Sequence, residues 1–266
     1  MFRLSRHDDV LRLEMASAAS RAVGYTASAY LLRGVLVDTG IPARAAALAR
    51  FLDERTAAGA PVRGAVVTHQ HEDHAGNVAL LAERGIPLAM ADATRTAVRR
   101  VGPIGLYRRI TWYPMRPLPA GAPELVPAPL VLVPTPGHSP DHHAVWDPQT
   151  ETLFGGDLFL GVKVRIAHHE EDPRRLVGSL RAAAALRPRR LFDAHRGPVP
   201  NPTESLLAKA AWHEETIGAV DALIDRGWSD RAILRAVLGG ESLTGWLSAR
   251  DYSRLNFVRR LRATKP

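Results

Sequence analysis

The first hundred residues alternate between short apolar runs and longer segments with helical spacing. The apolar runs are bounded by turn residues, which is typical of strands. The helical segments carry apolar residues three or four positions apart, and two of them end at Gly59 and Gly85. This pattern predicts strands over residues 10–13, 28–32, 35–37, 65–67 and 88–90. It predicts helices from Pro42 to Gly59, from Ala75 to Arg84, and from a cap at Asp92.

Residues 102–136 break this pattern, because the segment holds nine of the 20 prolines. Proline fixes φ and donates no backbone hydrogen bond, so regular helix is not expected here. Aromatic and basic residues are interleaved in it: Tyr107, Trp112 and Tyr113 with Arg108, Arg109 and Arg116. A loop of this length is either a lid over a binding site or a surface connection, and the sequence leaves both open.

The second half of the chain repeats the order of strands followed by helices. Apolar runs predict strands over 130–133, 143–146, 152–154 and 191–192, and helical spacing predicts helices over 173–186, 202–226, 229–238 and 251–262. Three tryptophans after residue 202 are expected to anchor a core, namely Trp212, Trp228 and Trp246. Two successive sets of strands and helices predict two packed sheets with helices outside them.

Composition restricts the chemistry of the chain. Its 266 residues are 46% hydrophobic, enough for one large α/β domain or two small ones. The absence of cysteine excludes disulfides, thiolate metal sites and cysteine nucleophiles, so a bound metal must be held by His, Asp or Glu. No apolar run is long enough for a membrane span, and the N-terminus lacks the apolar stretch of a signal peptide. A cytoplasmic protein with no membrane partner is therefore expected.

The chain is basic, with a formal net charge of +8. Of its 35 basic residues all but Lys163, Lys209 and Lys265 are arginine. This skew reflects either a coding bias or a preference for bidentate contacts with anions, and composition does not separate the two.

Three histidines and an aspartate are clustered in the string Thr68-His69-Gln70-His71-Glu72-Asp73-His74. The string follows a predicted strand and precedes a predicted helix, a position where loops often carry functional residues. Residues two apart in an extended segment point the same way, so His69 and His71 can bind one metal ion from one side. After the chain turns, Asp73 and His74 can face a second ion.

This string resembles the HxHxDH motif of the metallo-β-lactamase fold superfamily, and further resemblances follow in order. The second, third and fourth motifs of the family resemble Pro134-Thr-Pro-Gly-His138-Ser, Gly155-Gly156-Asp157 and Asp193-Ala-His195-Arg-Gly-Pro198. Asp38, in Leu36-Val-Asp-Thr-Gly40, resembles the acidic residue that supports the site in these proteins. The resemblance covers about residues 10–200.

The resemblance implies an α/β fold, a four-layer αββα sandwich with a C-terminal helical extension. Residues 1–200 would form the catalytic domain, and residues 201–266 would pack on it. The implied cofactors are two divalent metal ions, Zn²⁺ first and Fe or Mn as alternatives. Three ligands bind each ion and a seventh is shared: His69, His71 and His138 for the first, Asp73, His74 and His195 for the second, and Asp157 between them. Such a pair can bridge a hydroxide, which Asp73 would orient as the catalytic residue.

Four further residues are candidates for supporting the ligands or contacting substrate: Asp38, Tyr107, His142 and Arg196. Isolated histidines such as His7 and His213 are expected to be solvated or internally hydrogen-bonded and receive no role. The run His168-His169-Glu170-Glu171-Asp172 looks like a metal cluster in isolation. It precedes Pro173 at a predicted helix start, so acidic residues favoured by the helix dipole explain it better.

Several classes of this fold are disfavoured by the sequence. Only 18 residues lie between His138 and Asp157, where nucleases of the fold carry a large insertion. Flavodiiron proteins have Glu at the position of His71, and common zinc β-lactamases have a Cys ligand that this chain lacks.

The predicted function is a dinuclear metal-dependent hydrolase that uses a metal-bridged hydroxide on a small ester, thioester or lactone. The alternatives are a phosphodiesterase or endoribonuclease of the same fold, a mononuclear iron dioxygenase acting on persulfides, and a metal-bearing regulatory protein without turnover. A small-molecule substrate is expected, nucleic acid is a less favoured partner, and a homodimer stays open. Phosphate binding requires basic residues near the metals, for which the candidates are Arg108, Arg109, Arg165 and Arg196.

Overall fold

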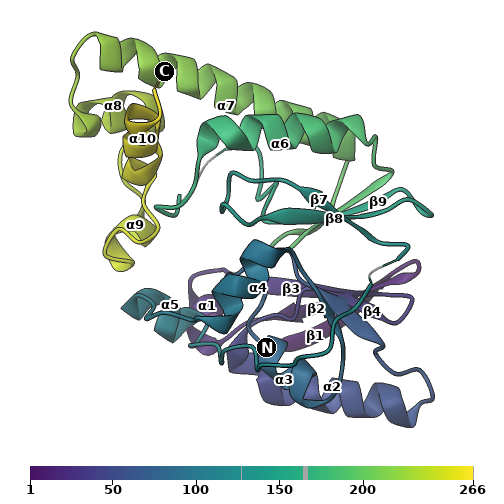
Figure 1. Ribbon diagram of the computed structural model, residues 1–266. Coiled ribbons are helices and arrows are strands. Elements are labelled where there is room, and N and C mark those ends of the chain that lie inside the picture. The colour runs from purple at the N-terminus through teal and green to yellow at the C-terminus, as the bar shows by residue number, and fades with distance from the viewer. Residues whose placement is uncertain (127, 164–166, 266) are drawn as a thin grey trace.

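Two mixed β-sheets form the centre of the protein in the computed structural model, which describes residues 1–126, 128–163 and 167–265 (Figure 1). The first sheet contains, in spatial order, β1 (Phe2–His7), β2 (Val10–Met15), β3 (Ala27–Leu32), β4 (Val35–Val37), β5 (Gly64–Val66) and β6 (Leu88–Ala89). The second contains β11 (Gly197–Val199), β10 (Arg190–Asp193), β9 (Thr152–Gly156), β8 (His143–Asp147) and β7 (Val131–Pro134).

Helices cover the outer faces of both sheets. The first sheet is covered by α2 (Ala45–Ala57), preceded by a 3-10 turn at Pro42–Arg44, and by α3 (Val78–Glu83). The second is covered by α6 (Pro173–Ala185) and α7 (Pro202–Asp225), which pack on each other. The remaining helices are α1 (Ala18–Ala22), α4 (Asp92–Arg99), α5 (Leu106–Thr111), α8 (Asp230–Leu238), α9 (Leu243–Leu247) and α10 (Arg254–Ala263). The fold is the predicted αββα sandwich with a C-terminal helical region.

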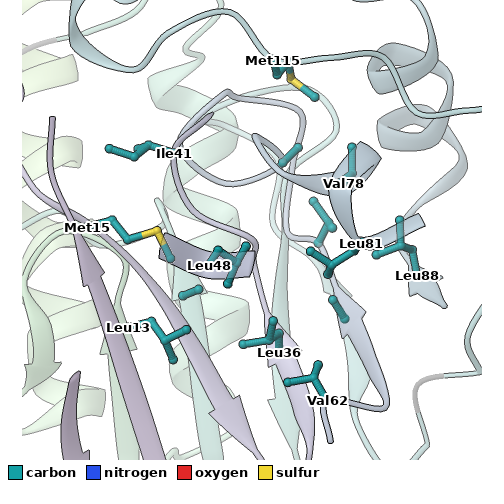
Figure 2. Packing of buried hydrophobic residues seen from close by; sticks show 14 of the residues in the cluster. Leu13, Met15, Leu36, Ile41, Leu48, Val62, Val78, Leu81, Leu88 and Met115 are labelled. Atoms are coloured by element: carbon teal, nitrogen blue, oxygen red, sulfur yellow. The ribbon is translucent and has the colours of Figure 1, made fainter. Parts of the chain in front are cut away.

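The core is divided by the sheets into layers. One apolar cluster fills the space between the first sheet and its helices, with Leu48 of α2 and Leu81 of α3 packed over Leu36 of β4 (Figure 2). A second lies between the two sheets, where the rings of Phe154 and Phe192 stack at a centroid distance of 5.5 Å. Because alternate residues of a strand point to opposite faces, each sheet contributes to two layers of the core.

The strand pairing brings the functional loops to one edge of the sandwich. In the first sheet β4 and β5 are parallel neighbours, so their carboxyl ends lead to Asp38 and Thr68 at the same edge. In the second sheet β9 and β10 are also parallel, and they lead to Asp157 and His195. Segments far apart in the sequence therefore meet where the candidate ligands lie.

Several local predictions are wrong. A short helix, α5, lies inside the proline-rich segment, between Pro103 and Pro114. Asp92 does not cap α4: it is the first helical residue, and the cap position is Ala91. The structure also contains β1, α1, β11 and α9, which the apolar pattern did not predict.

The tryptophan prediction fails for two of the three residues. The side chains of Trp228 and Trp246 are 38% and 66% exposed, and Trp212 is half-buried. The core of the C-terminal region is instead aliphatic around Phe257, with Val220 of α7, Ile233 of α8 and Val258 of α10. Among the described residues, no helix combines the length and apolarity needed to cross a membrane.

One buried hydrogen bond joins the two sheets next to the functional edge. The Tyr30 hydroxyl donates to the backbone carbonyl of Asp193 at 2.6 Å, and Tyr30 is 2% exposed. We expect Tyr30→Phe to lower the free energy of unfolding by about 1–3 kcal/mol, because the Asp193 carbonyl loses its buried partner. Tyr113→Phe, at a ring that is 51% exposed, is the control and is expected to change it by less than about 0.5 kcal/mol. Denaturant unfolding measures both, and equal stability of Tyr30→Phe and wild type contradicts this assignment.

Candidate metal centre

A first group of donor atoms is formed by three histidines from two loops. His69 Nε2 lies 3.0 Å from His71 Nδ1, which lies 3.1 Å from His138 Nε2. The loop after β5 carries His69 and His71, and the loop between β7 and β8 carries His138. Nitrogens this close can share one tetrahedral ion, since Zn–N bonds are about 2.0–2.1 Å long. Together with Asp157 these residues offer one ligand atom each within 4.8 Å of one another.

A second group lies directly beside the first and contains Asp73, His74 and His195. His195 Nε2 is 3.4 Å from Asp73 Oδ2, and His74 Nε2 is 3.8 Å from the same oxygen. His195 comes from the turn between β10 and β11, so this group also combines two distant segments.

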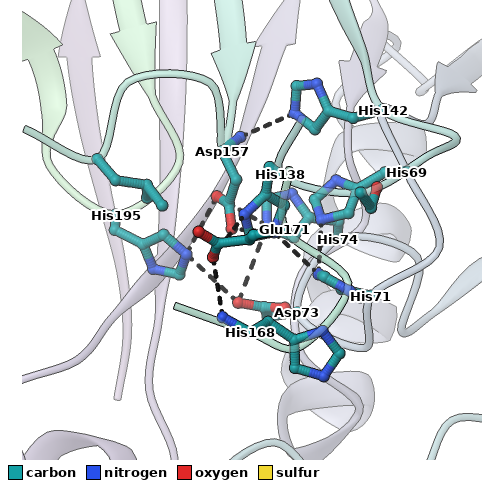
Figure 3. A network of polar contacts seen from close by, with 12 residues as sticks. His69, His71, Asp73, His74, His138, His142, Asp157, His168, Glu171 and His195 are labelled. Carbon is teal, nitrogen blue, oxygen red and sulfur yellow. Dashed lines mark hydrogen bonds and ion pairs between the residues drawn. The ribbon is translucent and has the colours of Figure 1, made fainter. Parts of the chain in front are cut away.

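Asp157 lies between the two groups and points one carboxylate oxygen at each (Figure 3). Its Oδ2 is 3.2 Å from His138 Nε2, whereas its Oδ1 is 3.2 Å from both His74 Nε2 and His195 Nε2. A single carboxylate in this position can be shared by two cations.

The second nitrogen of most of these rings is held by another group. Thr68 Oγ1 lies 3.0 Å from His69 Nδ1, Asp38 Oδ2 lies 2.8 Å from His74 Nδ1, and the Thr26 carbonyl lies 2.6 Å from His195 Nδ1. Such contacts fix the ring orientation and leave Nε2 facing the centre, as is usual for histidines that ligate metals.

Asp38 is the most connected of these supporting residues. Besides contacting His74, its carboxylate accepts hydrogen bonds from the Thr68 backbone at 2.8 Å and from the Thr68 hydroxyl at 3.0 Å. It adopts a φ of 63°, a left-handed conformation that Asp tolerates better than most residues. Asp38 therefore fixes both the β5 loop and the orientation of the His74 ring.

Gly137 explains how α6 can approach this edge so closely. Its φ is 144°, and a Cβ at this position would lie 2.5 Å from the Leu176 Cα. The His138 loop therefore packs directly on the first turn of α6, where the backbone N–H of Asp172 donates to the Gly137 carbonyl.

Burial and neighbouring charges act differently on the individual histidines of the centre, and the pKa of His138 in the first group is raised by Asp157 and Glu171 despite burial. Burial lowers the pKa of His69 and His71 well below the usual value, and the neighbouring histidines lower it further, so both rings are neutral with free lone pairs. Burial also acts to lower the pKa of His195, but Asp157 and Asp73 outweigh it and raise that pKa to about 9. The Asp157 and Asp73 carboxylates thus stabilise a positive charge at the position of His195.

The donor set fits metal ions better than internal hydrogen bonding. His71 Nε2, His74 Nε2 and Asp157 Oδ1 are buried and make no hydrogen bond with any described residue. Buried polar atoms are almost always hydrogen-bonded, so His74 Nε2 and Asp157 Oδ1, which face each other at 3.2 Å in the centre, indicate a place for a cation. His71 faces the centre with Nδ1, and its Nε2 faces Glu170 Oε2 at 3.7 Å. All donors are nitrogen or oxygen, which suits zinc and also iron or manganese.

The centre opens into a cavity of about 670 Å³. Asp73, Tyr107, His138, Asp157 and His195 line it together with Arg196, whose Nε donates to the Leu160 carbonyl at 2.8 Å. The proline-rich segment contributes Tyr107 and Trp112, and the C-terminal region contributes Ser242, Thr244, Tyr252 and Arg254. The cavity is therefore enclosed by both the sandwich and the C-terminal region.

His142 is placed behind the centre rather than in the cavity. It is fully buried, its Nδ1 lies 2.8 Å from Thr135 Oγ1, and its Nε2 accepts the backbone N–H of Asp157 at 3.1 Å. It can position Asp157, and a direct contact with substrate is not compatible with this location.

The acidic run before α6 was misinterpreted from the sequence. Only Asp172 acts at the helix start, as the cap, and the first turn contains no acidic residue. Glu171 lines the cavity with its Oε1 3.5 Å from His138 Nδ1, and Glu170 Oε2 lies 3.7 Å from His71 Nε2. His168 is 2% exposed, and its ring centroid lies 5.3 Å from that of His71. The accumulation of His and Glu in this run was the signal that could have identified it.

The expectation for His213 is also wrong. It is 1% exposed, lines the cavity, and neither ring nitrogen makes a hydrogen bond with a described residue.

The basic residues expected near the metals do not converge as a set. Arg108 is paired with Glu72 at 2.7 Å, and Arg109 is exposed. Arg165 lies outside the described residues. Arg196 does line the cavity, where three other cationic side chains join it: Lys163, Lys209 and Arg254.

Comparison with known proteins identifies the family. The model of the metallo-beta-lactamase superfamily matches residues 23–210. The chain belongs to the metallo-beta-lactamase superfamily. The matched range covers both sheets except β1 and β2, and it contains all seven candidate ligands.

Curated relatives include two beta-lactamase-like protein 2 homologs. The one from Caenorhabditis elegans is 26% identical over 204 residues, covering 70% of this chain and 63% of the relative, so less than two thirds of that relative is matched. The one from Drosophila melanogaster is 29% identical over 206 residues, covering 71% of this chain and 67% of the relative.

Solved structures show the same fold. A metallo-beta-lactamase from Pontibacter korlensis superposes with a TM-score of 0.62 at 15% identity, covering 80% of this chain and 99% of that protein. The metallo-beta-lactamase FIM-1 from Pseudomonas aeruginosa, in its mono-zinc form, superposes with a TM-score of 0.60 at 21% identity, covering 80% and 95%. At these identities the superpositions establish the architecture and leave the substrate open.

The contacts of Asp38 lead to a prediction about metal affinity. In Asp38→Asn the His74 ring loses its carboxylate partner, so we expect zinc affinity to fall by about 10- to 100-fold. Competition with a chromogenic chelator measures this change. Asp53→Asn, at an exposed carboxylate paired with Arg84, is the control. Unchanged affinity in Asp38→Asn contradicts the supporting role of Asp38.

Proposed function

We propose that this protein is a dinuclear metal-dependent hydrolase that acts on a small ester, thioester or lactone. The observation that carries the proposal is the position of Asp157, whose two carboxylate oxygens face two separate groups of nitrogen and oxygen donors. Two ions held there would lower the pKa of a water molecule and polarise the oxygen of the bond under attack.

The residues of the chain have distinct proposed roles. His69, His71 and His138 would hold one ion, Asp73, His74 and His195 the other, and Asp157 both. Asp73 has an additional role, because its carboxylate is at the cavity surface and beside the second group. It can orient the attacking water and accept its proton, which then passes to the leaving oxygen or sulfur as the acyl bond breaks.

The cavity supports a substrate of small-molecule size. A volume of about 670 Å³ is within the range of sites that enclose small ligands. Tyr107, Tyr25 and Trp112 give part of its wall an aromatic surface, and Tyr25 packs edge-on against His195 with ring centroids 5.8 Å apart. These rings can hold the apolar part of a substrate beside the centre.

A phosphodiester is the second candidate substrate, because four cationic side chains line the same cavity. A panel of substrates separates the two proposals. We expect the zinc-loaded protein to hydrolyse a thioester or a lactone faster than bis-nitrophenyl phosphate, with a β-lactam as the fourth member of the panel. Turnover of the phosphodiester alone would instead support the second candidate.

Metal content tests the hydrolase proposal independently of substrate. Elemental analysis of the purified protein is expected to find about two divalent ions per chain, mostly zinc, because the donors form two groups that share Asp157. About one iron and no zinc per chain would contradict the proposal and favour an iron dioxygenase.

The role of Asp73 is tested by Asp73→Asn. This change keeps the shape of the side chain but removes its ability to accept a proton, so we expect kcat to fall by about 10²- to 10⁴-fold. Circular dichroism and elemental analysis report whether the fold and the metals are retained, and Asp53→Asn serves as the charge-matched control. Near-normal turnover by Asp73→Asn would overturn the proposed mechanism.

A further inference from the structure

One wall of the cavity is formed by α7 and contains two buried polar residues. Lys209 and His213 lie four residues apart, so they project from the same face of the helix. Both line the cavity that also contains His138, Asp157 and His195. This wall belongs to the C-terminal region and lies outside the four motifs.

His213 has unused hydrogen-bonding capacity. Its ring packs between Trp212 and Phe257, with centroid distances of 5.1 and 5.7 Å, and it is 1% exposed. Burial and the charge of Lys209 lower its pKa to about 3, so the ring is neutral and offers one donor and one acceptor. Neither nitrogen makes a hydrogen bond with a described residue. Leaving a buried polar group unpaired costs about 1–3 kcal/mol, which a ligand could recover.

Lys209 is a buried cation without a carboxylate partner in the part of the chain that the structure describes. It is 5% exposed, and its ammonium donates to the backbone carbonyl of Phe159, two residues after Asp157. An ammonium carries three donors, so this bond leaves two available. Buried charges are normally paired at close range, whereas the carboxylates of Glu171, Asp193 and Asp157 act on this ammonium only from a distance and form no ion pair with it among the described residues.

The charge of the surrounding wall favours an anion. Lys163, Arg196 and Arg254 line the same cavity. Glu171 is the acidic residue of the wall outside the metal centre, and it faces His138 Nδ1 at 3.5 Å and accepts the backbone N–H of His168 at 3.1 Å. Its contacts direct it toward the centre.

We propose that Lys209 and His213 bind an anionic group of the substrate, a carboxylate or a phosphate, while the bond to be hydrolysed lies at the metal centre. The inference rests on the proposed hydrolase function and adds the class of substrate. The Lys209 ammonium pairs with the anion, and the His213 N–H donates to it. A neutral substrate of the same length offers no negative charge to the Lys209 ammonium and only weaker, uncharged hydrogen bonds.

The test uses three thioesters that are identical except for the far end, which is a carboxylate, a phosphate or an uncharged carboxamide. The zinc-loaded wild type is expected to show a kcat/KM about 10- to 100-fold higher for at least one anionic thioester than for the carboxamide, the range expected of charge-assisted hydrogen bonds. Lys209→Met is expected to reduce this ratio to about one, mainly through KM, and Lys209→Arg to retain part of it.

Arg181→Met is the control, because Arg181 is an exposed residue of α6 paired with Glu214 and is absent from the cavity wall. It removes the same charge and should leave the ratio unchanged. Equal kcat/KM for all three thioesters in wild type, or a preference that survives in a folded Lys209→Met, overturns the inference.

Binding of glutarate and inorganic phosphate, measured by calorimetry, separates failure of the inference from failure of the proposed function. If no thioester is hydrolysed but one anion binds at least 10-fold more weakly to Lys209→Met than to Arg181→Met, the anion site stands and the hydrolase proposal fails. If both variants bind both anions equally, the inference fails.

Discussion

Asp157 is a buried carboxylate surrounded by histidines from three different loops, and the architecture of the functional edge follows from this arrangement. Its oxygens lie 3.2 Å from nitrogens of His74, His138 and His195. Removing a carboxylate from water is costly unless it is paired, and here the neighbouring histidines lower its pKa well below the usual value despite burial. The Asp157 carboxylate can be buried in this way only if the histidine loops of both sheets lie at the same edge of the sandwich.

The two sheets meet this requirement through a parallel pair of interior strands in each sheet. The pair β4 and β5 directs Asp38 and the His69 loop to the edge, and the pair β9 and β10 directs Asp157 and the His195 turn to it. The hydrogen bond from Tyr30 to the Asp193 carbonyl joins the sheets beside this point. The C-terminal region completes the cavity with α7 and with the segment before α10. Tyr252 of that segment packs against Tyr107 of α5.

Much of this architecture was predictable because it depends on local sequence. Alternating apolar runs predicted most strands, and the spacing of His69, His71, Asp73 and His74 predicted two adjacent donor groups on one loop. His138, Asp157 and His195 are far apart in the sequence, and only the resemblance to a family assigned them to the same centre.

The remaining features depend on contacts that the sequence does not specify. The helix α5 forms because the prolines flank Leu106–Thr111 instead of interrupting it. Glu171 faces the centre because the chain before α6 turns toward His138, and His213 is buried because α8 and α10 cover α7. Trp246 is exposed for the converse reason, since no described element covers that side of α9.

The central claim is that one carboxylate, Asp157, joins two metal sites. Anomalous X-ray scattering at the zinc absorption edge, measured on crystals of the zinc-loaded protein, tests it directly. The account predicts two peaks: one beside His69, His71 and His138, the other beside Asp73, His74 and His195, and both in contact with Asp157. A single peak at full zinc loading, or a second peak held by His168 and Glu170 in place of Asp73 and His195, would contradict it.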